Sequence, residues 1–108
     1  MLPKKQRVGK ELFALVFAKG NSFHSPSMSL KTIPDEKKAN FSVVAQKSAS
    51  SGAVGRNKLR RQGYYVLQKN RAILSAGHLS VFFIKKKIPF AQIESEMLAL
   101  LRRARLTT

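Results

Sequence analysis

The chain has 108 residues, no cysteine and a formal charge of +16, from 21 Lys and Arg against 5 Asp and Glu. This length fits one domain, and a hydrophobic content of 44% supports a core, which argues against disorder throughout. The lack of cysteine excludes disulfides and thiolate metal sites, and the charge imbalance favours a polyanionic partner such as nucleic acid.

All acidic residues lie before residue 37 or after residue 93. An anionic membrane would also attract such a charge, but no apolar run approaches the roughly 20 residues that span a bilayer. Residues 1–7 lack the apolar core of a signal peptide, and neither His24 nor His78 has a second metal ligand nearby in the sequence. We therefore expect a cytoplasmic protein that makes no membrane contact and binds no metal itself.

The first predicted element is a helix over residues 9–19. Leu12 and Val16 recur at helical spacing. Phe13 and Phe17 lie one turn apart, a spacing more typical of core residues than of a binding site.

Three strands are expected next. Residues 22–24 and 28–33 form two of them, and the turn Ser25-Pro26-Ser27 joins them into a hairpin. Residues 41–45, with the sequence FSVVA, form a strand that is β-branched and apolar enough to lie in the centre of a sheet.

A long basic helix is expected over about residues 53–75, followed by a strand over residues 79–84 and a final helix that begins near Pro89. The final helix is acidic towards its start and basic at its end, the order that the helix dipole favours. Its expected core face is Phe90, Ile93, Met97, Leu100 and Leu101. This order of elements predicts a single α+β domain over residues 1–108, a two-layer sandwich of one sheet and its helices.

The long basic helix sorts its residues onto two faces at 3.6 residues per turn. The polar face comprises Arg56, Asn57, Arg60, Arg61, Tyr64, Gln68 and Arg71. The apolar face comprises Leu59, Gly63, Val66, Leu67, Ile73 and Leu74. Because glycine costs about 1 kcal/mol relative to alanine inside a helix, Gly63 indicates a close approach of the helix to the sheet.

Arginines on adjacent turns suit a folded RNA, because each guanidinium can form paired hydrogen bonds with phosphate oxygens. The alternative is an ordinary solvated face, and the net charge of +16 argues against it. A nuclease centre in the protein would need clustered acids or an acid–base pair. Five dispersed acids and two separated histidines do not supply one.

The segment from Phe41 to Arg61, FSVVAQKSASSGAVGRNKLRR, resembles the signature of bacterial ribonuclease P proteins. In both, a strand is followed by a Lys-containing connection, then Ala-Val, then the pattern Arg-Asn-x-x-Lys/Arg-Arg. The resemblance extends from Leu2-Pro3-Lys4 and the first helix to a Leu-rich terminal helix. This combination is more specific than the basic stretch alone.

The resemblance implies a four-stranded mixed sheet with three helices, similar to the second domain of ribosomal protein S5. It also implies a left-handed crossover from the strand at residues 41–45, through the long helix, to the strand at residues 79–84. Right-handed crossovers are strongly favoured in general, so composition alone would not predict this topology.

The resemblance further implies a protein subunit of ribonuclease P, which promotes cleavage at the 5′ end of precursor transfer RNA. The positions matched to contacts with the catalytic RNA are Arg56, Asn57, Lys58, Arg60 and Arg61. The positions assigned to the single-stranded 5′ leader are Phe13, Phe17, Lys31 and Lys47. One protein would bind one catalytic RNA, and that RNA with its Mg²⁺ ions would carry out the reaction, without a cofactor on the protein.

The chain departs from the family pattern at five positions. These are Lys31, Ser48, Ser51, Gly52 and Tyr64. The serines and the glycine stand where basic residues are usual, Tyr64 stands for an arginine, and Lys31 stands for an aromatic residue. A lysine at position 31 can hold a leader phosphate but cannot stack a base, which changes the balance of charge and stacking.

Several assignments keep an alternative. Phe13 and Phe17 suit the core as well as the leader, and Tyr64 or Tyr65 can stack on RNA or close the core. The three lysines at residues 85–87 are better explained as a solubilising end to a strand than as an RNA contact. A small basic ribosomal or nucleoid-type protein is the alternative to a ribonuclease P subunit.

Overall fold

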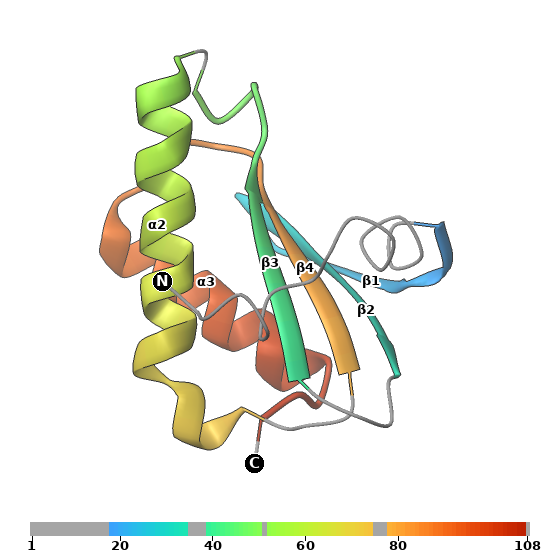
Figure 1. Ribbon diagram of the computed structural model, residues 1–108. Helices are drawn as coiled ribbons and strands as arrows, with labels where there is room; N and C mark the ends of the chain where they lie inside the picture. Colours follow the sequence, from blue (N-terminus) through green and yellow to red (C-terminus); the bar gives the residue numbers. More distant parts are fainter. Residues whose placement is uncertain (1–17, 35–38, 51, 75–77, 108) are drawn as a thin grey trace.

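The computed structural model describes residues 18–34, 39–50, 52–74 and 78–107. The elements in chain order are β1 (Asn21–His24), β2 (Met28–Pro34), β3 (Ala39–Ala45), α2 (Ala53–Lys69), the 3₁₀ helix η2 (Arg71–Ile73), β4 (His78–Ile84) and α3 (Phe90–Arg103), as Figure 1 shows. Of the predicted first helix, only Ala18 and Lys19 are described, and both are helical. Phe13 and Phe17 lie outside the described residues.

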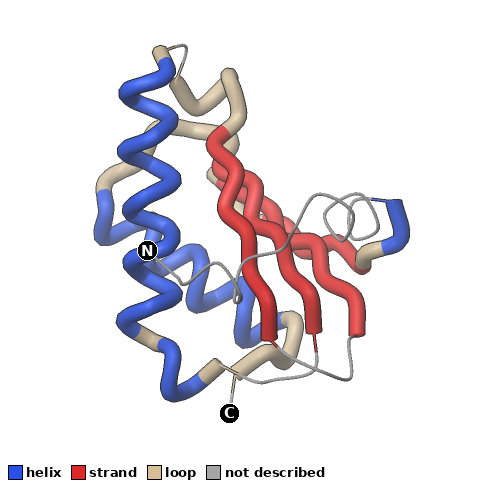
Figure 2. Tube along the Cα trace, viewed as in Figure 1, coloured by secondary structure: helices blue, strands red, loops and turns tan. Residues whose placement is uncertain are grey.

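The four strands form one mixed sheet in the order β1-β2-β4-β3 (Figure 2). β1 pairs with β2, and β2 with β4, in antiparallel orientation, whereas β3 and β4 run parallel. The β1–β2 hairpin turns where the Ser25 N–H donates to the Met28 carbonyl at 2.9 Å. The predicted hairpin and the mixed four-stranded sheet are therefore confirmed, and α2 connects the two parallel strands.

The prediction that residues 41–45 form a central strand is wrong. β3 lies at one edge of the described sheet, and β4 lies between β2 and β3. β4 is buried along its whole length, with Phe82 and Ile84 in the core beside the helices. Its alternate residues Leu79, Val81 and Phe83 form a second apolar cluster on the other face. β3 and β4 are similarly apolar, so composition alone could not show which of them is central.

α2 and α3 cover the same face of the sheet (Figure 1). The core between the sheet and these helices includes Met28, Leu30, Val43, Leu67, Phe82, Ile84, Ile93, Met97, Leu100 and Leu101. The predicted core face of α3 is therefore confirmed, with Phe90 only partly buried at its margin. A Cβ atom on Gly63 would lie 2.7 Å from Cγ1 of Val43. This distance confirms the close helix-to-sheet approach.

Tyr64 packs into this core instead of lying on the polar face of α2, and only 4% of its surface is exposed. Its hydroxyl accepts a hydrogen bond from the backbone N–H of Val43 at 3.2 Å. An edge strand has N–H groups that no neighbouring strand can pair with, and the Tyr64 hydroxyl accepts the hydrogen bond from one of these groups in β3. Of the two alternatives given for the tyrosines, stacking on RNA or packing in the core, Tyr64 therefore packs in the core.

α2 ends at Lys69, before the predicted residue 75. Asn70 caps the end of α2, where its side-chain amide donates to the carbonyl of Val66 at 2.9 Å in addition to its backbone N–H at 3.1 Å. The chain continues into η2, which leaves Ile73 39% exposed instead of on the apolar face. Leu74 packs against the core as expected.

Glu96 of α3 is buried beneath the β1–β2 turn. Its carboxylate accepts hydrogen bonds from the Ser25 hydroxyl, from the Ser27 N–H at 2.9 Å and from the Gln92 amide at 2.8 Å. Burial opposes ionisation and is the largest single effect on the pKa of Glu96, but the hydrogen bonds together outweigh it and lower the pKa below the usual 4.5. Glu96 therefore connects α3 to the β1–β2 hairpin through hydrogen bonds. The first turn of α3 itself contains no acidic residue.

Candidate nucleic-acid interface

The first turns of α2 carry four exposed polar side chains, here called the α2 strip. They are Asn57, Lys58, Arg60 and Arg61. The first turn of α2 contains no acidic residue. The positive end of the helix dipole lies at this same end, so it adds to the positive potential of the strip. The fold therefore brings four of the five residues matched to RNA contacts onto one open surface.

Asn57 holds Arg60 within the α2 strip. The guanidinium of Arg60 donates a hydrogen bond to the side-chain oxygen of Asn57, one turn before it in the helix. A guanidinium has five N–H donors, so this bond orients the group and leaves other donors for a phosphate. Asn57 is therefore a positioning residue for Arg60.

Arg56 differs from the α2 strip because it is half-buried. Its Nη1 donates to the carbonyl of Ser50 at 3.0 Å. A Cβ atom on Gly55 would lie 2.2 Å from the Ser50 hydroxyl oxygen, so the connection between β3 and α2 packs directly against the helix. Arg56 therefore stabilises this connection, a role that its place in the sequence pattern did not reveal.

Of the residues assigned to the leader, Lys31 lies apart from the α2 strip. Lys31 of β2 is half-buried and pairs with Val81 of β4, whose side chain belongs to the cluster on the face away from α2 and α3. The sheet therefore separates Lys31 from the α2 strip. Lys47 is exposed just after β3, and Phe13 and Phe17 are outside the described residues.

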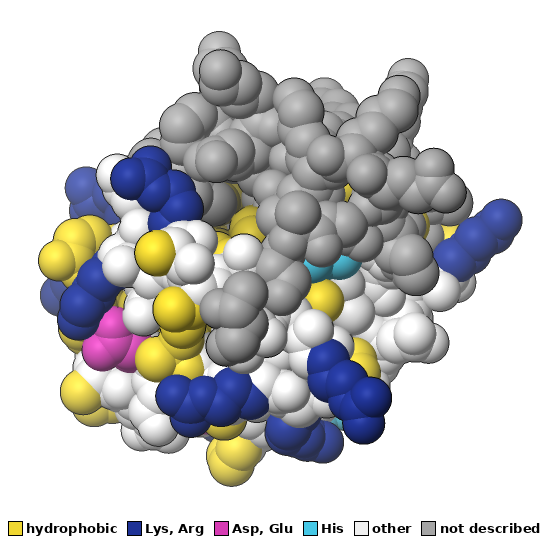
Figure 3. Space-filling model, turned by 90° about the horizontal axis from the view of Figure 1, so that it is seen from below, with side chains coloured by type: hydrophobic (Ala, Val, Ile, Leu, Met, Phe, Trp, Pro, Cys, Tyr) yellow, Lys and Arg dark blue, Asp and Glu magenta, His cyan; other side chains and the backbone are white. Residues whose placement is uncertain are grey.

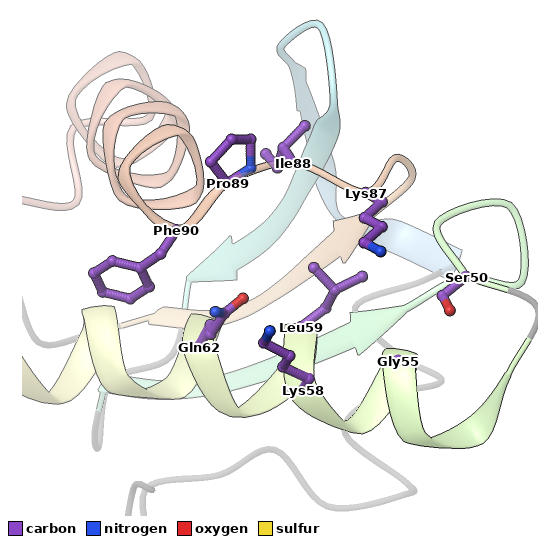
Figure 4. Close-up of a pocket in the computed structure, with 9 residues that line it drawn as sticks. All are labelled: Ser50, Gly55, Lys58, Leu59, Gln62, Lys87, Ile88, Pro89 and Phe90. Atoms are coloured by element: carbon purple, nitrogen blue, oxygen red, sulfur yellow. The ribbon is translucent and has the colours of Figure 1, made fainter.

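The sequence pattern did not predict a hollow between α2 and the segment that joins β4 to α3 (Figure 4). Its volume is about 470 Å³, and Lys58 reaches it from α2 while Lys87 reaches it from the other side. A neighbouring hollow of about 450 Å³ is lined by Lys58, Arg61, Gln62, Tyr65 and Phe90. Lys87 and Phe90 are distant from α2 in sequence, so only the tertiary structure reveals this surface.

The two described acids, Glu94 and Glu96, have other partners and do not pair with the cations of the α2 strip or with Lys87. Glu96 is buried in its own network, and Glu94 forms an ion pair with Lys69 at 3.2 Å. Figure 3 views the molecule from the end opposite the start of α2, and Lys and Arg side chains are also spread over that end, with little acidic surface among them. Within the described ranges, no three His, Cys, Asp or Glu side chains gather as metal ligands. The described helices include none that is long and apolar enough to cross a membrane.

The sequence model of the ribonuclease P family matches residues 2–105. The chain belongs to the ribonuclease P protein family. It is therefore a subunit of ribonuclease P, and the match leaves the ribosomal or nucleoid-type alternative without support. A sequence search among curated proteins gives no significant match.

Solved ribonuclease P proteins share this fold at low sequence identity. A Staphylococcus aureus RNase P protein mutant with defective mRNA degradation activity is 18% identical, with a TM-score of 0.83, over 95% of this chain and 91% of that one. The RNase P protein from Thermotoga maritima is 21% identical, with a TM-score of 0.75, over 84% of this chain and 89% of that one. These similarities establish the shared fold.

Proposed function

We propose that the α2 strip binds the catalytic RNA of ribonuclease P. The observation that carries this proposal is the exposure of Lys58, Arg60 and Arg61 within two turns of one helix whose first turn has no acid. Guanidinium groups at this spacing can follow an RNA backbone through paired hydrogen bonds to phosphate oxygens. RNA binding would also relieve the mutual repulsion of a chain with a charge of +16.

The 5′ leader of precursor transfer RNA binds, in this proposal, on the other face of the sheet. Lys31 supplies a cation on that face, and Lys47 lies at the start of the connection that Arg56 holds in place. Phe13 and Phe17 would add the aromatic surface that Lys31 cannot offer, and their role stays a prediction. The two RNA partners would then contact the protein on separate surfaces.

The protein positions RNA in this proposal and does not itself cleave it. Five dispersed acids and two separated histidines supply no acid–base or metal centre in the sequence, so the RNA and its Mg²⁺ ions would carry the chemistry. One protein per catalytic RNA and a cytoplasmic location follow from the same role. The third helix, the left-handed crossover and the relationship to the second domain of ribosomal protein S5 stay predictions of the fold.

Reconstitution tests this function. The catalytic RNA, precursor transfer RNA and protein are combined at low Mg²⁺, and 5′ cleavage is measured with each component left out in turn. We expect the protein to increase cleavage by the RNA and to leave the precursor intact when the RNA is omitted. Site-specific cleavage by RNA-free protein, after removal of contaminating nucleases, would contradict the proposed division of labour.

Two single substitutions test the two surfaces separately. Arg60→Gln should weaken assembly with the catalytic RNA for every precursor. Lys31→Gln should weaken binding only of precursors whose leader is long enough to reach that face. Binding of long-leader and short-leader precursors to each assembled enzyme distinguishes these outcomes, and a uniform loss in the Lys31→Gln enzyme would remove the leader assignment.

A further inference from the structure

We propose that Tyr65 and Phe90 form a stacking site for one unpaired base of the ribonuclease P RNA, flanked by Lys58, Arg61 and Lys87. These five residues are here called the aromatic groove. This inference rests on the proposed function and extends the RNA-binding surface from the α2 strip towards α3. Nothing in the sequence pattern groups these residues.

The two rings are placed so that one of them is open to a ligand. Tyr65 is 54% exposed, among the most exposed large hydrophobic residues in the described part of the chain. Its ring centroid lies 5.7 Å from that of the half-buried Phe90, at an interplanar angle of 56°. Phe90 therefore contacts the Tyr65 ring, and about half of Tyr65 stays open to solvent. An aromatic face held in this way can stack on a nucleobase of any identity.

Cations line the two hollows that adjoin this aromatic pair. Lys58 and Arg61 line the same hollow as the two rings, and Lys58 also lines the adjoining hollow that Lys87 enters from the other side (Figure 4). Each hollow has a volume of about 450–470 Å³, within the range of sites that hold small molecules. The nearest acid of α3 on this side, Glu94, is already paired with Lys69.

Charge and continuity together identify the occupant as RNA. A protein partner would have to bring acidic groups to three cations, whereas one or two nucleotides present both the phosphates and a flat base. Lys58 and Arg61 belong to the α2 strip as well as to the aromatic groove, so the same RNA can run across both. Lys31, the leader candidate in the described sheet, lies on the other face, which argues for the catalytic RNA over the leader.

The test compares two variants of Tyr65 and one control variant of Ile73, each in the full chain with the catalytic RNA. Tyr65→Phe keeps the ring, Tyr65→Leu keeps an apolar side chain without a ring, and Ile73→Ala alters another exposed hydrophobic residue outside the groove. Loss of one stacked base should weaken binding by about tenfold for Tyr65→Leu, while Tyr65→Phe and Ile73→Ala should match the parent. Melting temperatures establish that each variant is folded.

The salt dependence separates stacking from charge. Tyr65→Leu should leave the slope of log affinity against log salt unchanged, whereas Lys58→Gln should reduce its magnitude by about 0.7–0.9, the value for one phosphate contact. If Tyr65→Leu binds like the parent while Arg60→Gln binds weakly, the aromatic groove is overturned and the proposed function stands. If the parent itself does not bind the catalytic RNA, both are overturned. A Tyr65→Leu defect seen only with long-leader precursors would overturn the choice of catalytic RNA.

Discussion

The two halves of α2 differ in how many of their residues are buried. Residues 53–62 bury only Leu59, whereas residues 63–69 bury Gly63 and the side chains of Tyr64, Val66 and Leu67. The second half is held by Gly63 and Tyr64, which both contact Val43 of the edge strand. One continuous helix therefore has an anchoring half and a half that presents the α2 strip. Stability and RNA binding should respond to different substitutions along the same element.

The strongest test of the anchoring half is Leu67→Ala. Leu67 is fully buried between the sheet and the helices, so its removal leaves a cavity. We expect the free energy of unfolding to fall by about 2–5 kcal/mol, measured by urea denaturation. The neighbouring substitution Gln68→Ala, on an exposed side chain, should change it by no more than about 0.5 kcal/mol. Equal stability of the two variants would show that the second half does not anchor α2.

Tyr64→Phe should have the next largest effect. The substitution keeps the ring in the core but leaves the buried N–H of Val43 without its acceptor, which costs about 1–3 kcal/mol of unfolding free energy. Tyr65→Phe removes an exposed hydroxyl from the adjacent position and is the matched control, with an expected change below about 0.5 kcal/mol. Thermal unfolding of the pair at one pH decides whether the bond from the edge strand contributes to stability.

Glu96→Gln perturbs stability without touching α2, and its effect should depend on pH. The pKa of Glu96 is lower in the folded chain than in the unfolded chain, so its carboxylate stabilises the fold above the unfolded value near 4.5. That contribution is lost as the pH falls through the lowered folded pKa. We expect Glu96→Gln to cost about 1 kcal/mol at pH 7 and to approach the parent as the pH falls below 4.5. A stability difference that is constant from pH 7 to pH 3 would contradict this assignment.

Arg60→Ala combined with Arg61→Ala should have the smallest effect on stability, within about 0.5 kcal/mol, because both side chains are exposed. The same variant should reduce the magnitude of the salt slope for binding the catalytic RNA by about 1.4–1.8, the value for two phosphate contacts. Arg71→Ala combined with Arg102→Ala removes the same charge from elsewhere on the surface and should leave that slope unchanged. Equal slopes for the two double variants would mean that the strip contributes only through net charge.

The sequence predicted much of the fold and part of the candidate site. The spacing of apolar residues placed the strands and α3, since a half-buried element must repeat its apolar residues with its own period. Gly63 indicated the contact with the sheet because a glycine inside a helix needs a compensating packing reason. The signature around residues 41–61 led to the family, which the match over residues 2–105 shows.

Contacts between residues that are distant in the sequence could not be predicted from spacing or from the sequence signature. Helical spacing placed Tyr64 on the polar face of α2, and only the tertiary structure, with its hydrogen bond to the edge strand, shows that it lies in the core. Arg56 and Arg60 belong to one basic pattern, yet one binds the connection before α2 and the other remains open to a ligand. Periodicity reports which face of an element a residue shares and does not report what packs against that face.

By itself, the sequence determined the composition of the surface: a strongly cationic chain with arginines on one side of a long helix and an apolar stripe on the other. Local rules of spacing and charge suffice for that, because each residue is compared only with neighbours along its own element. The tertiary structure alone decided that β3 is an edge strand, that Glu96 points inward, and that Tyr65 meets Phe90 beside three cations. Those outcomes depend on which distant segments pack together, since strand order and helix contacts are set by the whole core and not by any one segment.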